Sequence, residues 1–86
     1  MIHFNGNNFE IISSETSVTL FGVENKKVYF LNETSQYIFE SIANGISLEA
    51  TVNDFCKNRE YDINVVYNDF KKTIDYLLKE GIFCDE

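Results

Sequence analysis

The residue types that most often carry chemistry are sparse in this sequence. It contains two cysteines, Cys56 and Cys84, and one histidine, His3. The cysteines lack the CxxC spacing of zinc sites and of thioredoxin-like redox sites. We expect both to be small buried hydrophobic residues, because free cysteine is among the most buried residue types. We expect His3 to be solvated in a loose N-terminus.

No other set of residues suggests catalysis. The sequence has no Ser/His/Asp or Cys/His set, no glycine-rich phosphate loop and no cluster of metal ligands. The acidic pair Asp85-Glu86 is typical of a solvated tail. We therefore expect a protein that is not an enzyme and holds no cofactor or metal, so that any chemistry belongs to a partner.

Length and composition limit the class of protein. The chain has 86 residues, of which 44% are hydrophobic, which predicts a single globular domain over residues 1–86 with one modest core. No run of about 20 apolar residues could cross a bilayer, and the N-terminus lacks the features of a signal peptide. We expect a cytoplasmic protein in which residues 1–8 are loosely ordered.

The charge balance points away from nucleic acids. The sequence has 14 acidic and 7 basic residues, a formal net charge of -7 at pH 7. This charge opposes approach to the phosphates of DNA or to an anionic membrane. A partner surface is therefore expected to be neutral or basic.

The first third of the chain is strand-like. Residues Phe9–Ser13 and Ser17–Glu24 carry β-branched and aromatic side chains. The polar segment Glu24–Lys27 supplies a turn before a third strand, Val28–Leu31. Two successive hairpins predict a three-stranded antiparallel meander. The third strand is apolar or aromatic on both faces, which raises the question of what covers its second face.

The remainder of the chain predicts three helices, each with a start signal. Asn32, Ser47 and Asp62 can cap the exposed N–H groups of a first helical turn. Asn44-Gly45 and Gly81 can supply left-handed stops. The expected helices run from Glu33 to Ala43, from Leu48 to about Asn58, and from Ile63 to about Glu80.

The third predicted helix has a wide apolar stripe. At about 100° per residue its apolar side chains cover an arc of about 120°. Such a stripe either serves a small core alone or leaves one edge for a partner. Its members are Ile63, Val66, Tyr67, Phe70, Ile74, Leu77 and Leu78.

Three strands followed by three helices predict an α+β fold of the winged-helix-like kind. Folds of this type serve either to read DNA with a helix or to bind a peptide along a sheet edge. A set of residues between about Val18 and Phe83 has a combined spacing found in a known family: Leu31-Asn32, Ile38, Gly45, Asp69-Phe70, Leu77 and Gly81-Ile82. By this spacing the sequence resembles the PqqD-like domains, which are peptide chaperones of pyrroloquinoline quinone biosynthesis. The same fold is called the RiPP recognition element in other pathways that modify ribosomally made peptides.

The resemblance implies that a leader peptide binds as an added strand beside the third strand, in a groove closed by the third helix. Such strand addition is one of the recurring modes of peptide recognition. Lys27 and Lys71 would flank the groove and could meet acidic residues of the leader. The resemblance also implies a modifying enzyme as partner, such as a radical SAM maturase, a cyclase or a leader peptidase. The expected peptide-binding residues are Lys27, Val28, Tyr29, Phe30, Leu31, Tyr67, Phe70, Lys71 and Ile74.

Two alternatives remain at this level. One is a winged-helix DNA-binding domain, although the predicted third helix interleaves its lysines with acids instead of presenting a basic face. The other is a structural or antitoxin-like interaction module without a peptide ligand. The interleaved residues are Lys71, Lys72 and Lys79 with Asp69, Asp75 and Glu80.

Duplex DNA separates the first alternative from peptide binding. Because the net charge is -7, we expect no measurable binding to duplex DNA in a mobility-shift assay at physiological salt. Salt-sensitive binding in the micromolar range would favour the winged-helix alternative.

Overall fold

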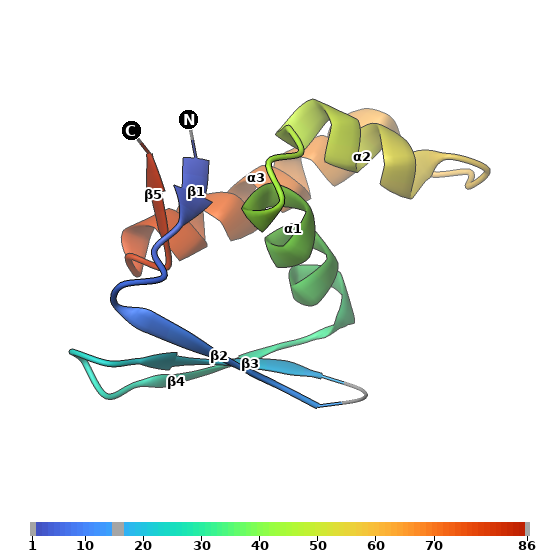
Figure 1. Ribbon diagram of the computed structural model, residues 1–86. Helices are drawn as coiled ribbons and strands as arrows, with labels where there is room; N and C mark the ends of the chain where they lie inside the picture. Colours follow the sequence, from blue (N-terminus) through green and yellow to red (C-terminus); the bar gives the residue numbers. More distant parts are fainter. Residues whose placement is uncertain (1, 15–16, 86) are drawn as a thin grey trace.

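The chain forms a three-stranded sheet, a two-stranded sheet and three helices in the computed structural model, which describes residues 2–14 and 17–85. The helices lie on one side of the three-stranded sheet, and α2 is the helix farthest from it (Figure 1). This arrangement confirms the predicted α+β fold. The elements are β1 (Ile2–Phe4), β2 (Phe9–Ser13), β3 (Val18–Gly22), β4 (Val28–Leu31), α1 (Glu33–Ala43), α2 (Leu48–Cys56), α3 (Ile63–Lys79) and β5 (Phe83–Asp85).

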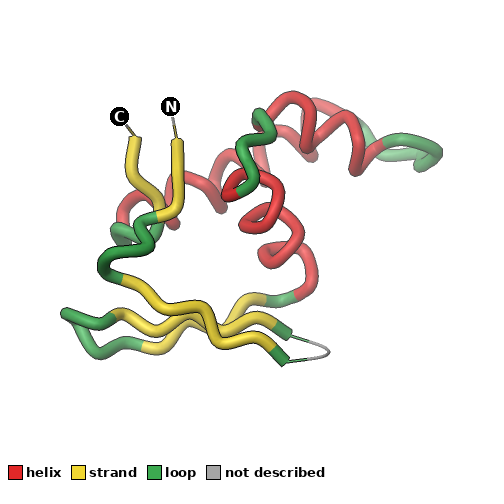
Figure 2. Tube along the Cα trace, viewed as in Figure 1, coloured by secondary structure: helices red, strands yellow, loops and turns green. Residues whose placement is uncertain are grey.

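The three-stranded sheet is the predicted meander, with strand order β2-β3-β4 and antiparallel pairing throughout. The tube view follows its two hairpins along the lower part of the molecule (Figure 2). Because side chains alternate along a strand, one face of the sheet turns towards the helices. Leu20 of β3 stands opposite Tyr29 of β4 on this face, and both are buried. The middle strand is shorter than the predicted Ser17–Glu24, since the chain turns after Gly22.

The helices start where the sequence predicts. Asn32, Ser47 and Asp62 each accept a hydrogen bond from a backbone N–H two or three positions on, at 2.8, 3.1 and 2.9 Å. Each cap satisfies one of the N–H groups that a first helical turn leaves without an intrahelical partner. The bounds of α1 are those predicted.

The helix ends depend on residues with positive φ. Gly45 and Gly81 have φ of 85° and 80°, the left-handed conformation expected of them. Helix α2 ends at Cys56, slightly before the predicted end near Asn58. Asn58 itself has a φ of 62°, so it belongs to the reversal that follows the helix. Asparagine tolerates this conformation better than most residues.

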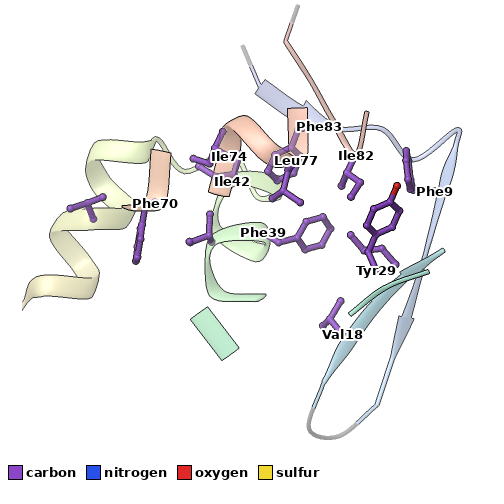
Figure 3. Packing of buried hydrophobic residues seen from close by; sticks show 13 residues of the cluster. Phe9, Val18, Tyr29, Phe39, Ile42, Phe70, Ile74, Leu77, Ile82 and Phe83 are labelled. Atoms are coloured by element: carbon purple, nitrogen blue, oxygen red, sulfur yellow. The ribbon is translucent and has the colours of Figure 1, made fainter. Parts of the chain in front are cut away.

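The core runs from the sheet to the far end of α3. Tyr29 and Val18 lie at its sheet end, whereas Phe70 lies at its opposite end among the helices (Figure 3). There the ring of Phe70 contacts those of Tyr37 and Phe55, with centroids 6.4 and 5.0 Å apart. Helix α3 therefore spans the whole core, and its two ends are held by different neighbours.

Part of residues 1–8, the segment that the sequence predicted to be loose, forms a strand. Ile2–Phe4 pairs antiparallel with Phe83–Asp85, so that β1 and β5 form a two-stranded sheet beside the helices. The ring of Phe4 meets Phe39 of α1 edge-on, with centroids 5.3 Å apart. The pairing also places Asp85 in a strand, where a solvated tail was expected, and Glu86 lies outside the described residues.

The few residues of potential chemical interest lie apart. Cys56 and Cys84 are free and only half-buried, not fully buried as predicted. His3 is exposed in β1. Within residues 2–14 and 17–85, no group of three or more His, Cys, Asp or Glu side chains is arranged to hold a metal ion. None of the helices formed by these residues has the length and hydrophobicity needed to span a bilayer.

The stability of the domain should depend strongly on Leu77, a residue of α3 that is 1% exposed and packs in the core. We expect Leu77→Ala to lower the free energy of unfolding by about 2 to 5 kcal/mol, the range for deleting a buried leucine side chain. Urea denaturation measures this change. Lys72→Ala on the exposed face of the same helix is the control and should change stability by less than about 0.5 kcal/mol. Equal effects of the two substitutions would contradict the packing of α3.

Candidate functional site

The open edge of β4 is the first component of the candidate site. Within the described residues, β4 pairs with β3 alone. The C=O of Lys27 accepts from the N–H of Gly22 at 2.9 Å, and hydrogen-bonded pairs alternate along an antiparallel ladder. This alternation turns the backbone groups of Tyr29 towards β3 and those of Val28 and Phe30 towards the open edge. A further strand could therefore bond to Val28 and Phe30.

A cavity of about 260 Å³ lies beside this edge, between β4 and α3. Its wall on α3 carries hydroxyl and apolar groups, and Tyr76 on that wall is 51% exposed. The cavity therefore offers an apolar lining with a few hydrogen-bonding groups, a composition common in ligand sites. The lining residues are Val28, Tyr29, Phe30 and Leu31 of β4, Ser35 of α1, and Thr73, Tyr76 and Leu77 of α3.

The two faces of β4 have different surroundings. Tyr29 is buried against the core, and Leu31 is half-buried on the same face. Val28 and Phe30 point to the other face and are 48% and 82% exposed. No described helix or strand covers this outer face, so the second apolar face of β4 is open to solvent.

The predicted binding residues divide into two groups in the structure. Val28–Leu31 are brought together along the edge and cavity, and Lys27 is exposed in the turn just before them. The predicted residues of the third helix lie elsewhere. Phe70 and Ile74 are buried in the core, and Tyr67 is half-buried against it.

Lys71 lies at a different cavity from the one beside β4. It lines a cavity together with Ile74 and Leu78 of α3 and residues of the α1–α2 connection. Its Nζ lies 3.3 Å from Oδ2 of Asp75, in an exposed ion pair. Lys71 therefore does not flank the groove beside β4.

The α3 residues that do face β4 were missed by sequence reasoning. Thr73 and Tyr76 are flanked in the helix by the buried Ile74 and Leu77, and they border the apolar stripe instead of forming its centre. On a helix, one residue of displacement rotates a side chain by about 100°, so the edge of the stripe and its centre face different neighbours. A search for polar and aromatic residues along the border of the stripe could have found them.

The hydroxyl group of Tyr29 makes two side-chain hydrogen bonds. Its hydroxyl donates to Oε1 of Glu80 at 3.0 Å and accepts from Nδ2 of Asn25 at 3.1 Å. Burial raises the pKa of Tyr29 above its usual value, and the hydrogen bond to Glu80 raises it further. The phenol is therefore neutral at physiological pH and fixed in direction by two partners.

Comparisons with known proteins place this geometry in a wider context. No protein-family model and no curated protein sequence matches the chain. Two solved structures share its fold. One is TbiB1 in complex with the TbiA(beta) leader peptide, at 14% sequence identity and a TM-score of 0.85. The other is lasso peptide synthetase B1 complexed with the leader peptide, at 13% identity and a TM-score of 0.87.

The similarity extends over nearly the whole of each chain. It covers 98% of this chain in both cases, with 96% of TbiB1 and 98% of the lasso peptide synthetase B1. Coverage this complete includes both sheets and all three helices of the described residues. At identities this low, TbiB1 and lasso peptide synthetase B1 establish the common fold.

The surroundings of Tyr29 predict an alkaline transition. Because the folded protein favours the neutral phenol, the stability contributed by Tyr29 should be complete below about pH 10 and should fall as the pH rises further. Ultraviolet absorbance of ionised phenol, compared between the wild type and Tyr29→Phe, isolates this titration. A difference signal that titrates below pH 10 would contradict the buried, hydrogen-bonded position of the hydroxyl.

Proposed function

We propose that this protein binds the leader segment of a ribosomally made precursor peptide as an added strand on β4, and delivers that peptide to a modifying enzyme. The observation that carries the proposal is the open edge of β4 beside a cavity against α3. The fold shared with TbiB1 and with lasso peptide synthetase B1, both solved with a leader peptide, supports the choice of ligand.

The backbone of β4 would supply affinity that tolerates sequence variation. The N–H and C=O groups of Val28 and Phe30 face the open edge, and each hydrogen bond to a docked strand contributes about 0.5 to 1.5 kcal/mol net. Selectivity would come from alternate side chains of the leader, since every second residue of an added strand points into the cavity. There they would meet Leu31, Thr73 and Tyr76.

Charge would adjust this binding only slightly. Lys27 is exposed next to the open edge and could pair with an acidic residue of the leader. An exposed pair of this kind contributes at most about 1 kcal/mol. Phe70 and Ile74 would belong to the core instead of the groove, and Lys71 would remain with Asp75 at the other cavity.

The chemistry would belong to a partner enzyme, such as a radical SAM maturase, a cyclase or a leader peptidase. The protein itself would be a non-catalytic carrier of the peptide. The exposed apolar side chains of Val28 and Phe30 on the outer face of β4 would lie next to the docked leader. A partner could thus contact carrier and leader together. A cytoplasmic location fits this role, because the precursor is made on ribosomes.

Substitution of Val28 tests the proposed groove. Val28→Asp should weaken leader binding at least tenfold, about 1.4 kcal/mol, because it places a charge beside the docked strand. Val65→Asp makes the same chemical change at an exposed position of α3 outside the cavity and should leave affinity within about twofold. Lys72→Ala should have as little effect. The measurement is a calorimetric titration with a synthetic leader taken from any short precursor found to be encoded beside this gene.

Amide NMR shifts during the same titration locate the ligand. Binding as an added strand should shift the amides of Val28–Leu31 and of Thr73 and Tyr76. Shifts concentrated on α2, with Val28–Leu31 unchanged, would overturn the groove assignment even if binding were tight.

A further inference from the structure

A chain of hydrogen bonds connects the turn between β3 and β4 to the end of α3. Oδ1 of Asn25 accepts from the backbone N–H of Lys27 at 2.9 Å, and Nδ2 of Asn25 donates to the Tyr29 hydroxyl at 3.1 Å. The same hydroxyl donates to Oε1 of Glu80 at 3.0 Å. We call Asn25, Tyr29 and Glu80 the relay. Each side chain of the relay has its direction fixed by a partner.

The local sequence is built to hold Asn25 in place. The turn is closed by two backbone hydrogen bonds of 2.9 Å, from Gly22 to Lys27 and from Lys26 to Gly22. Lys26 has a φ of 61°, which lets the chain reverse within this short segment. A side chain on Gly22 would overlap with that of Asn25. Glycine at this position therefore leaves the room that the relay needs.

The relay borders the groove through Tyr29, while Asn25 and Glu80 line a separate cavity of about 170 Å³. Tyr29 lines the cavity from β4, and Glu80 is the C-terminal cap of α3, one turn beyond Tyr76. Tyr29 projects from the sheet beside Phe9, whose ring centroid is 6.0 Å away (Figure 3). The hydrogen bond between Tyr29 and Glu80 therefore sets a distance between β4 and the end of α3.

We propose that Tyr29, through Asn25 and Glu80, is a positioning residue that holds β4 and α3 at the separation required by a docked peptide strand. The inference rests on the proposed function, because the separation matters only if a strand enters there. An apolar contact at this place would allow the helix end to slide. Hydrogen bonds prefer defined distances and angles, so the relay fixes the groove before the ligand arrives.

Preorganisation predicts a specific effect on affinity. If the helix end moves freely, only a fraction of molecules has the binding geometry, and the apparent Kd rises by the inverse of that fraction. Stability should change less, since Asn25 is exposed and Glu80 half-exposed, so both can bond to water when Tyr29 loses its hydroxyl. Affinity and stability therefore report on different properties.

Substitutions that break the relay should weaken peptide binding, and their effects on the Kd should not add. We expect Tyr29→Phe and Glu80→Ala each to raise the Kd about fivefold, and the double variant to raise it no further, because either change breaks the same link. Glu80→Gln keeps an acceptor oxygen and should restore most of the affinity lost in Glu80→Ala. The probe is the same synthetic leader, labelled with fluorescein and followed by fluorescence polarisation. Tyr61→Phe, an exposed tyrosine outside the relay and the groove, is the matched control.

A second readout needs no peptide. Without peptide, the Tyr29→Phe variant should show altered amide shifts along Tyr76–Gly81 and at Thr73, compared with the Tyr61→Phe variant. The amide hydrogens of the same residues should also exchange faster. Changes confined to the neighbours of residue 29, or additive losses of affinity, would overturn the relay. A wild-type protein that binds no leader would instead refute the proposed function, and the exchange rates of the free proteins would still decide the role of Tyr29.

Discussion

The packing of the sheet against the C-terminal half of α3 is the interaction on which the rest of the structure depends. Leu20 and Tyr29 on the inner face of the sheet and Leu77 and Ile82 from the helix end are all buried in one cluster. Full burial of one such side chain contributes about 1.5 to 3 kcal/mol, a large share of the net stability of a small domain. Because this contact fixes where α3 crosses the sheet, it also fixes what remains uncovered. The uncovered parts of the sheet include the edge of β4.

An open strand edge is normally a liability, since it can pair with another copy of the same chain. Here β4 is only four residues long, and a lysine precedes it. The net charge of -7 repels other copies at long range. These features oppose self-association but leave the edge accessible to a peptide. Under the proposed function, the same edge would satisfy two requirements, resistance to self-association and readiness for a ligand strand.

Local signals in the sequence were sufficient for most of the fold. The caps Asn32, Ser47 and Asp62 and the two left-handed glycines predicted the helices nearly to their end residues. The pairing of Ile2–Phe4 with Phe83–Asp85 could not be predicted in this way. Each of these strands has three residues, too few for a periodic pattern, and their partners lie at opposite ends of the chain. Contacts of this kind become visible only when the intervening fold is known.

The candidate site shows why a helix can be predicted while its binding face is not. The strongest apolar positions of α3, such as Phe70 and Ile74, are used by the core of so small a domain. A ligand can then meet only side chains at the border of the stripe, which must tolerate water when the groove is empty. Thr73 and Tyr76 have this mixed character. Under the proposed function, such border residues could change with the ligand while the core keeps the fold. TbiB1 and lasso peptide synthetase B1 share this fold at 14% and 13% identity, so very different sequences can form it.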